Sequence, residues 1–242
     1  MLGLPIMTME FAVGRASQKS PVKAYYALEK PGQKWHIHGY ITLIGCYLLM
    51  MFYTTIGGWI LLYVFKMAGG EFEGKNADEI AGVFGNLMEK PGLMTICMIV
   101  VVAACFGIVC MGLQKGVEKI TKKMMLLLLA LMVILAIRSA TLPGAGEGIR
   151  FYLLPDFKKA AESGMKEVIF AAMGQSFFTL SLGIGAIAIF GSYIDKKRRL
   201  TGEAVCVTIL DTCVALIAGM IIFPACFAFG VQPDSGPSLV FI

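Results

Sequence analysis

Two carboxylic acids lie deep in apolar sequence: Glu10 within residues 5–11, and Asp211 within residues 207–213. An acid inside a bilayer costs about 3 kcal/mol on insertion scales, so it needs a compensating partner. Backbone or hydroxyl hydrogen-bond donors would make the acid structural. A hard cation would make it a ligand, because carboxylate oxygens suit such ions. We favour the structural role for Glu10 and the cation site for Asp211, with both roles open for each.

The segment 173–185 is the second polar feature, with one glutamine, Gln175, and three hydroxyl residues. It ends in Gly183-Ile184-Gly185, and glycine lowers helix propensity by about 1 kcal/mol per residue. These residues predict a helix broken near its midpoint, which is tolerated in a membrane only where the backbone lines a cavity or ligand site. Broken helices are typical of inverted-repeat secondary transporters. The alternative is that Gly183 and Gly185 only allow close helix packing.

The composition predicts the kind of protein that positions these residues. Of 242 residues, 57% are hydrophobic and 15% are charged, and the mean hydropathy is +0.77. Soluble domains carry about 25% charged residues. These values exclude a disordered chain, a secreted disulfide scaffold and an ordinary cytosolic enzyme. They predict an all-α polytopic membrane protein, because open sheets leave backbone groups unsatisfied in lipid.

Five segments are long enough to cross about 30 Å of hydrocarbon as helices. They are residues 40–65, 92–113, 124–142, 168–194 and 205–231. Residues 1–13 are apolar but too short to cross alone, and an apolar stretch resumes at 239–242. We therefore expect residues 1–13 to be the end of a helix whose beginning is missing.

The loops between these segments predict the orientation in the membrane. Residues 14–39, 114–123 and 195–204 are short and basic, whereas residues 66–90 contain more acids than bases. The positive-inside rule places the three basic loops in the cytoplasm. The net charge of +5 is thus a topology signal rather than a nucleic-acid patch. The seven cysteines lie in apolar runs without a C-x-x-C pair, which favours packing over metal or disulfide roles.

Four stretches of the chain together resemble a known family. They are residues 3–15, 53–59, 174–186 and 192–193. The sequence is similar to the neurotransmitter:sodium symporters, specifically their bacterial amino-acid transporter branch. The resemblance implies part of an inverted-repeat (5+5 helix) bundle, with residues 1–13 as the end of the second helix. The remaining segments would then be the third (40–65), fourth (92–113), fifth (124–142), broken sixth (168–194) and seventh helix (205–231), and the start of an extracellular loop (232–242).

The same resemblance implies a substrate site. Tyr53 takes the place of the tyrosine that meets the substrate carboxylate, and Leu49, one turn earlier, lines the apolar pocket. Phe178 matches the aromatic lid, and Ser181 the serine at the helix break. Ile184 stands where many relatives have an aromatic residue or methionine. This apolar lining suggests a hydrophobic or aromatic amino acid as substrate.

It also implies a sodium site formed by Thr179 and Asp211. The family commonly has asparagine at the second position. Counting back from Phe223-Pro224 leaves a one-residue ambiguity between Asp211 and Leu210, and chemistry decides it because leucine cannot ligate sodium. The aspartate predicts chloride-independent transport, since a fixed carboxylate can offset the charge of sodium in place of a bound chloride. Our hypothesis is that Asp211 takes a proton once sodium leaves, which would give proton antiport.

Three further residues receive roles around these sites. Glu10 resembles the glutamate that supports the unwound part of the sixth helix, and Gln175 is expected near the ion site. Tyr193 resembles the intracellular-gate tyrosine, although an interfacial aromatic belt explains it equally well. We assign no function to His36 and His38.

The predicted function is therefore sodium-coupled amino-acid symport by alternating access in the cell (plasma or inner) membrane. Na⁺ is the coupling ion, with no organic cofactor and no nucleic-acid partner. Catalysis is not expected, since the chain has no H-E-x-x-H, G-x-S-x-G or P-loop pattern. The alternatives are a six-helix channel or scaffold, or a non-functional truncated transporter. The first helix and the eighth to last, which complete the family's sites, are absent from the match. If Met1 is the true start, we expect the chain alone neither to bind nor to transport.

Overall fold

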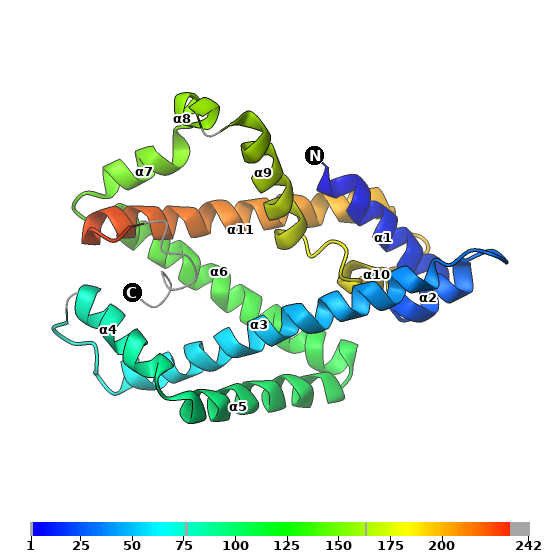
Figure 1. The fold of residues 1–242 in the computed structure, drawn as a ribbon, viewed down its shortest axis with the longest axis horizontal. Coiled ribbons are helices and arrows are strands. Elements are labelled where there is room, and N and C mark those ends of the chain that lie inside the picture. The colour runs from blue at the N-terminus through cyan, green and yellow to red at the C-terminus, as the bar shows by residue number, and fades with distance from the viewer. Residues whose placement is uncertain (1, 76, 163, 233–242) are drawn as a thin grey trace. The chain divides into compact units, whose positions relative to one another are not determined.

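The computed structural model describes residues 2–75, 77–162 and 164–232, and every regular element in these ranges is a helix. In chain order they are α1 (Gly3–Ser17), α2 (Pro21–Leu28), α3 (His36–Ala68), α4 (Ala77–Met88), α5 (Pro91–Cys110), the π-helical turn η1 (Leu113–Glu118), α6 (Lys119–Ala140), α7 (Ala145–Leu153), α8 (Phe157–Glu162), α9 (Met165–Thr179), α10 (Ala186–Ser192) and α11 (Leu200–Phe229) (Figure 1). The predicted all-α class is confirmed.

By length and composition, four helical stretches of the described residues are suited to cross a membrane. They are His36–Ala68, Pro91–Cys110, Gly116–Ala140 and Leu200–Phe229. The predicted span 168–194 is not among them, because its residues are divided between α9 and α10. Each half is shorter than the roughly 20 residues that a crossing needs.

Most helix ends differ from the predicted segments for a common reason. Hydropathy marks only the turns that lie in hydrocarbon, whereas a helix continues into the headgroup region wherever its residues favour helix. The helix α3 therefore begins at His36 rather than at residue 40, and α6 begins inside the predicted loop 114–123, with lysines in its first turns. Lysine combines good helix propensity with a side chain that reaches the interface. The predicted loops also contain α2, α4, α7 and α8.

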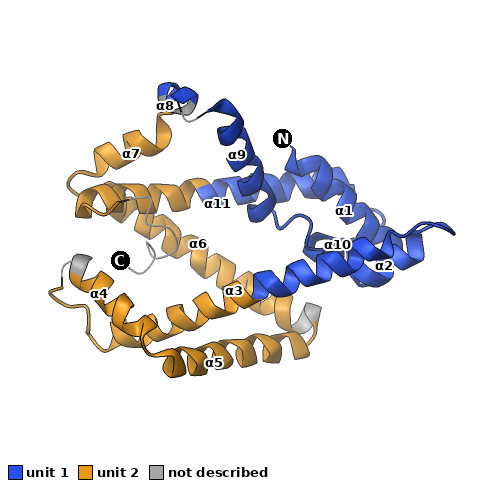
Figure 2. Cartoon of the chain, in the orientation of Figure 1, with its two compact units in different colours: residues 1–50, 156–215 blue, residues 51–155, 216–242 orange. Residues whose placement is uncertain are grey.

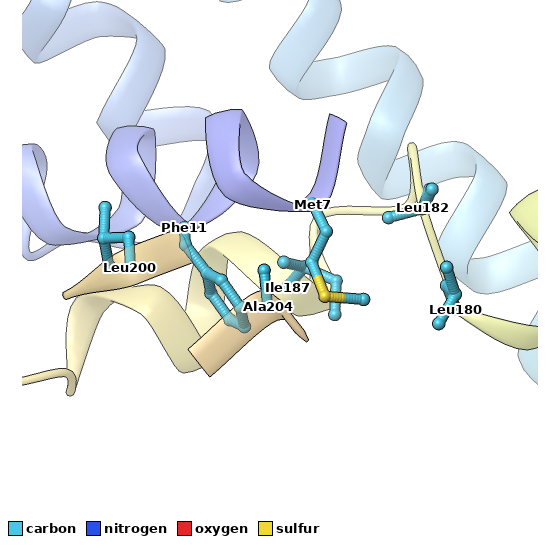
Figure 3. Close-up of a cluster of buried hydrophobic side chains, with 7 residues drawn as sticks. All are labelled: Met7, Phe11, Leu180, Leu182, Ile187, Leu200 and Ala204. Carbon is cyan, nitrogen blue, oxygen red and sulfur yellow. The ribbon is translucent and has the colours of Figure 1, made fainter. Parts of the chain in front are cut away.

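The chain divides into two compact units, and α3 and α11 each contribute to both (Figure 2). Unit 1 comprises residues 1–50 and 156–215. Seven buried residues form its core: Met7, Phe11, Leu180, Leu182, Ile187, Leu200 and Ala204 (Figure 3). The helices α1 and α10 approach closely because glycine faces backbone at their contact. A Cβ on Gly191 would lie only 2.7 Å from the Phe11 carbonyl oxygen.

Unit 2 comprises residues 51–155 and 216–242, described here to residue 232. One buried cluster joins α3, α4 and α5 through Leu62, Tyr63, Leu87 and Cys97. A second packed region of unit 2 surrounds Pro224 of α11. This proline is fully buried and lacks a backbone N–H. Here the Ser139 hydroxyl of α6 donates a 2.7 Å hydrogen bond to the Ile221 carbonyl.

Candidate functional site

The helix α9 stops at Thr179 in a Schellman motif. The Leu182 N–H donates to the Phe177 carbonyl at 3.0 Å, and the Ser181 N–H donates to the Phe178 carbonyl at 3.1 Å. This pattern places the residue after the helix cap in the left-handed region, and Ser181 has φ 53°. The motif's usual apolar contact is also present, since Leu182 is buried in the unit 1 core and Phe177 packs against that core. The predicted interruption thus has a specific local cause.

Glu10 holds the backbone beyond this motif. Its Oε1 accepts a 2.7 Å hydrogen bond from the Gly183 N–H, so the amide freed by the break is satisfied by a side chain of α1. The other oxygen, Oε2, is buried and has no hydrogen-bond partner among the described residues. One of the two carboxylate oxygens therefore has the kind of backbone partner that a structural role would need, and that role stays a prediction.

Gly185 directly precedes α10, at a position that requires its lack of a side chain. Its φ is 74°, and a Cβ there would lie 2.6 Å from Thr42 Cγ2 and 2.9 Å from Pro21 Cγ. Both alternatives for the glycines therefore apply to this one residue, because it turns the chain and also allows close packing. No sequence pattern would have placed Thr42 of α3 and Pro21 of α2 beside the break, and Thr42 is itself buried.

Thr179 and Asp211 meet at the end of α9. The Thr179 hydroxyl lies 3.1 Å from Oδ1 and 3.0 Å from Oδ2 of Asp211 and donates to this carboxylate. Thr179 is the last residue of α9, and Asp211 is half-buried near the middle of α11. The pair offers three oxygen atoms to a cation, and hard cations prefer such oxygens. The described residues contain no group of three or more His, Cys, Asp or Glu side chains that could hold a metal.

The remaining predicted site residues lie partly around this break. Ile184 Cγ2 is 4.0 Å from the position of a Cβ on Gly45, and Leu49 follows Gly45 by one turn of α3. Ile184 and Leu49 are both half-buried in unit 1. Phe178, with 52% of its surface exposed, directly precedes Thr179.

Three further predicted residues are also exposed. Tyr53 belongs to unit 2 and is 46% exposed. Gln175 is exposed on α9, one turn before Thr179. Tyr193 follows α10 and is 62% exposed.

One contact between Glu29 and His36, outside the predicted spans, fixes the start of α3. Glu29 Oε2 accepts the His36 backbone N–H at 3.0 Å and lies 2.9 Å from His36 Nδ1. The hydrogen bond with the His36 side chain lowers the pKa of Glu29 below its ordinary value. The Tyr26 ring stacks on His36 with centroids 4.6 Å apart, which completes the contact between α2 and α3. His36 thus has a structural partner that its position in the sequence did not predict.

The chain has clear relatives among known proteins. Residues 71–232 match the family described as "Sodium:neurotransmitter symporter family". The chain belongs to this family. The resemblance seen in the sequence is thereby confirmed, and the protein is a multi-pass membrane protein of a transporter family rather than an enzyme.

This chain aligns with individual relatives over its whole length, but it spans only about half of the length of each relative. The chain is 37% identical over 241 residues to the "Uncharacterized sodium-dependent transporter YhdH" of Bacillus subtilis, and the alignment covers 100% of this chain and 52% of the relative. An "Uncharacterized sodium-dependent transporter" of Haemophilus influenzae is 33% identical, with coverage of 100% and 54%. The crystal structure of MhsT in complex with L-phenylalanine superimposes with a TM-score of 0.89 at 41% identity, covering 99% of this chain and 54% of MhsT.

Proposed function

We propose that this chain provides part of a sodium-coupled amino-acid symporter, with the ion held by Thr179 and Asp211. The observation that carries the proposal is the contact at 3.0–3.1 Å between the Thr179 hydroxyl at the end of α9 and the Asp211 carboxylate, which is half-buried in the apolar helix α11. An uncompensated carboxylate in such surroundings is expensive. A bound cation would offset its charge, and the Thr179 hydroxyl would turn a lone pair toward the ion.

The carboxylate also suggests how charge is balanced through the transport cycle. Asp211 carries a fixed negative charge beside the proposed ion, so no external anion is needed and transport is chloride-independent. When sodium leaves, the same carboxylate takes up a proton and carries it back. The observation behind this step is that Asp211 is the sole acidic residue in residues 204–229.

The substrate that fits this arrangement is a hydrophobic or aromatic amino acid. Leu49, Ile184 and Phe178 supply apolar surface in unit 1, and the relative MhsT has been crystallised with L-phenylalanine. We assign the substrate carboxylate to Tyr53 and a polar contact at the break to Ser181. Gln175 and Glu10 support the ion site and the broken segment, and Phe178 and Tyr193 act as gates.

The rest of the site would come from the part of the family fold that this chain does not match. The chain spans about half the length of its relatives, and MhsT extends well beyond the superimposed part. We place the chain within a 5+5 inverted-repeat bundle of the cell membrane, with loops 14–39, 114–123 and 195–204 in the cytoplasm. The segments equivalent to the first and eighth helices would complete the ion and substrate sites.

Uptake by proteoliposomes tests this function. The protein expressed from its native gene is assayed for labelled L-phenylalanine uptake driven by a sodium gradient, with and without chloride. We expect saturable, chloride-independent uptake. Asp211→Asn should raise the sodium concentration for half-maximal uptake by roughly tenfold, about 1.4 kcal/mol. A strict chloride requirement in the unmodified protein would refute the role of Asp211.

Two threonine variants separate the ion site from general helix effects. Thr179→Val removes the hydroxyl that faces Asp211, so it should also weaken sodium dependence. Thr208→Val is the matched control, because among the described residues the Thr208 hydroxyl bonds only the Ala204 carbonyl of its own helix, at 2.8 Å. Equal effects of the two variants would contradict the proposed site, and flux that does not saturate with substrate would favour a channel.

A further inference from the structure

A cavity of about 390 Å³ lies at the end of α1, and none of its lining residues belongs to the broken segment. Ala12, Arg15 and Ala16 of α1 line it together with Lys196, which follows α10. Its lining comes entirely from unit 1. The two basic residues belong to the loops 14–39 and 195–204, which the positive-inside rule places in the cytoplasm.

The loop that carries Lys196 is ordered by its own hydrogen bonds. The Arg198 N–H donates to the Asp195 carbonyl at 3.0 Å, and the Lys197 N–H donates to Asp195 Oδ1 at 3.2 Å. Arg15 Nη1 then donates to the Arg198 carbonyl at 2.7 Å. This last bond ties the end of α1 to the loop and fixes the guanidinium at the edge of the cavity.

The basic residues here differ in whether an acid neutralises them. Arg198 pairs with Glu203 at 2.8 Å. Within the part of the chain that the structure describes, Arg15 and Lys196 form no ion pair. The cavity therefore presents two uncompensated positive charges.

The residues that line the cavity suit a phosphate with an apolar neighbour. Ala12 and Ala16 are one helical turn apart on the same side of α1, and their short side chains leave the space beside Arg15 open. An arginine guanidinium can donate two parallel hydrogen bonds to phosphate oxygens, and a lysine adds a mobile point charge. Basic pockets at the cytoplasmic ends of membrane helices suit anionic headgroups.

We propose that this cavity binds the phosphate group of an anionic phospholipid, with Arg15 and Lys196 as its ligands. The location favours a lipid over a free anion, because Lys196 lies in the loop just before α11, a helix long and apolar enough to cross the bilayer. The negative surface potential of the cytoplasmic leaflet concentrates such headgroups at this level. The inference concerns a separate site and does not need transport activity, but it rests on the proposed cytoplasmic placement of loops 14–39 and 195–204.

A titration with lipid tests the proposal. The full chain in uncharged detergent is titrated with phosphatidylglycerol, and the midpoint of thermal unfolding is measured. Parallel titrations use phosphatidylcholine and millimolar inorganic phosphate. We expect a saturable rise of the midpoint with phosphatidylglycerol alone. An equal rise with phosphatidylcholine would overturn the role of charge, and an equal rise with inorganic phosphate would assign the site to free anions.

Charge variants locate the binding. Lys196→Gln should weaken phosphatidylglycerol binding about fivefold, because one basic residue near a membrane surface is worth about 1 kcal/mol. Lys197→Gln removes the same charge from the neighbouring residue, which does not line the cavity, and should change binding less than about twofold. Equal losses would mean diffuse surface attraction and would overturn the proposed site.

A variant that keeps every charge tests the cavity itself. Ala16→Leu fills the space beside Arg15 and should abolish the phosphatidylglycerol effect while the unfolding midpoint without lipid stays within a few degrees. Full binding by this variant would overturn the proposal. Arg15→Gln is less suitable, since it also removes the hydrogen bond to the Arg198 carbonyl.

Discussion

Ser181 holds a backbone conformation that glycine would hold at lower cost. It is the left-handed residue of the Schellman motif that ends α9, with φ 53°. Glycine is the usual residue at this position, because an L side chain crowds the following carbonyl there. The Ser181 hydroxyl makes no hydrogen bond among the described residues. We therefore predict that Ser181→Gly stabilises the protein and that Ser181→Val destabilises it.

The expected change in the free energy of unfolding for Ser181→Gly is the sum of two opposing contributions. A left-handed conformation costs an L residue roughly 1–2 kcal/mol, which Ser181→Gly recovers. Glycine also gives the unfolded chain more freedom, which subtracts about 0.4–1 kcal/mol. The net gain should be about 0.5 kcal/mol, or roughly 1–2 °C in the unfolding midpoint. A β-branched side chain is further restricted there, so Ser181→Val should lose roughly 1 kcal/mol or more.

The measurement is the thermal unfolding midpoint in one detergent at one scan rate, with Ser181→Ala as the control. Alanine removes the hydroxyl but keeps a Cβ, so its midpoint should stay close to that of serine. A midpoint lower for Ser181→Gly than for Ser181→Ala would refute the backbone argument. Substrate uptake tests the proposed polar contact of Ser181 independently of the backbone effect. Ser181→Gly and Ser181→Ala both remove the hydroxyl, so they should reduce substrate affinity equally if the hydroxyl contacts the substrate.

Two further predictions concern helix packing and pH. Gly191→Ala should cost roughly 1–3 kcal/mol by overpacking against the Phe11 carbonyl, whereas Gly82→Ala should be neutral or stabilising, since nothing lies within 4 Å of its Cβ; unfolding midpoints compare them. Because the pKa of Glu29 is lowered in the folded state, its stabilisation is present above the ordinary value of 4.5 and is lost as pH falls through the lowered pKa. Glu29→Gln should reduce the loss of stability at acid pH. If the unfolding midpoint of this variant depends on pH as that of the unmodified protein does, the role of the Glu29–His36 contact is contradicted.

The polar residues at and around the broken segment could be predicted from the sequence, because a bilayer disfavours polar side chains that have no partner or ligand. Residue type alone marked Glu10 and Asp211, and the family resemblance marked Thr179; the structure brings Thr179 to Asp211 and Glu10 to the freed Gly183 amide. An acid or hydroxyl in an apolar helix must find a partner, so its position constrains the fold strongly.

Other features depend on long-range packing that no local pattern encodes. The helix α2 lies in a loop that hydropathy describes only as polar, and its docking depends on stacking of Tyr26 with His36 and on the fit of Pro21 beside Gly185. The role of Ser181 was assigned from the family resemblance, whereas its most specific feature in the structure is a backbone angle. That angle is a property of the motif closed by Phe177 and Leu182, and serine is an uncommon residue in it.

The position of Thr179 couples the proposed ion site to the broken segment. Thr179 is the last residue of α9, and Asp211 belongs to α11, so a cation between them would bind only while α9 ends where it now does. A ligand shifts an equilibrium only by its different affinity for the two states. We therefore expect the ion to favour the closed Schellman motif, because unwinding or extending α9 by one residue would turn the Thr179 hydroxyl away from Asp211. Since Glu10 holds the next free amide, the same event would reach α1 through the hydrogen bond to Gly183.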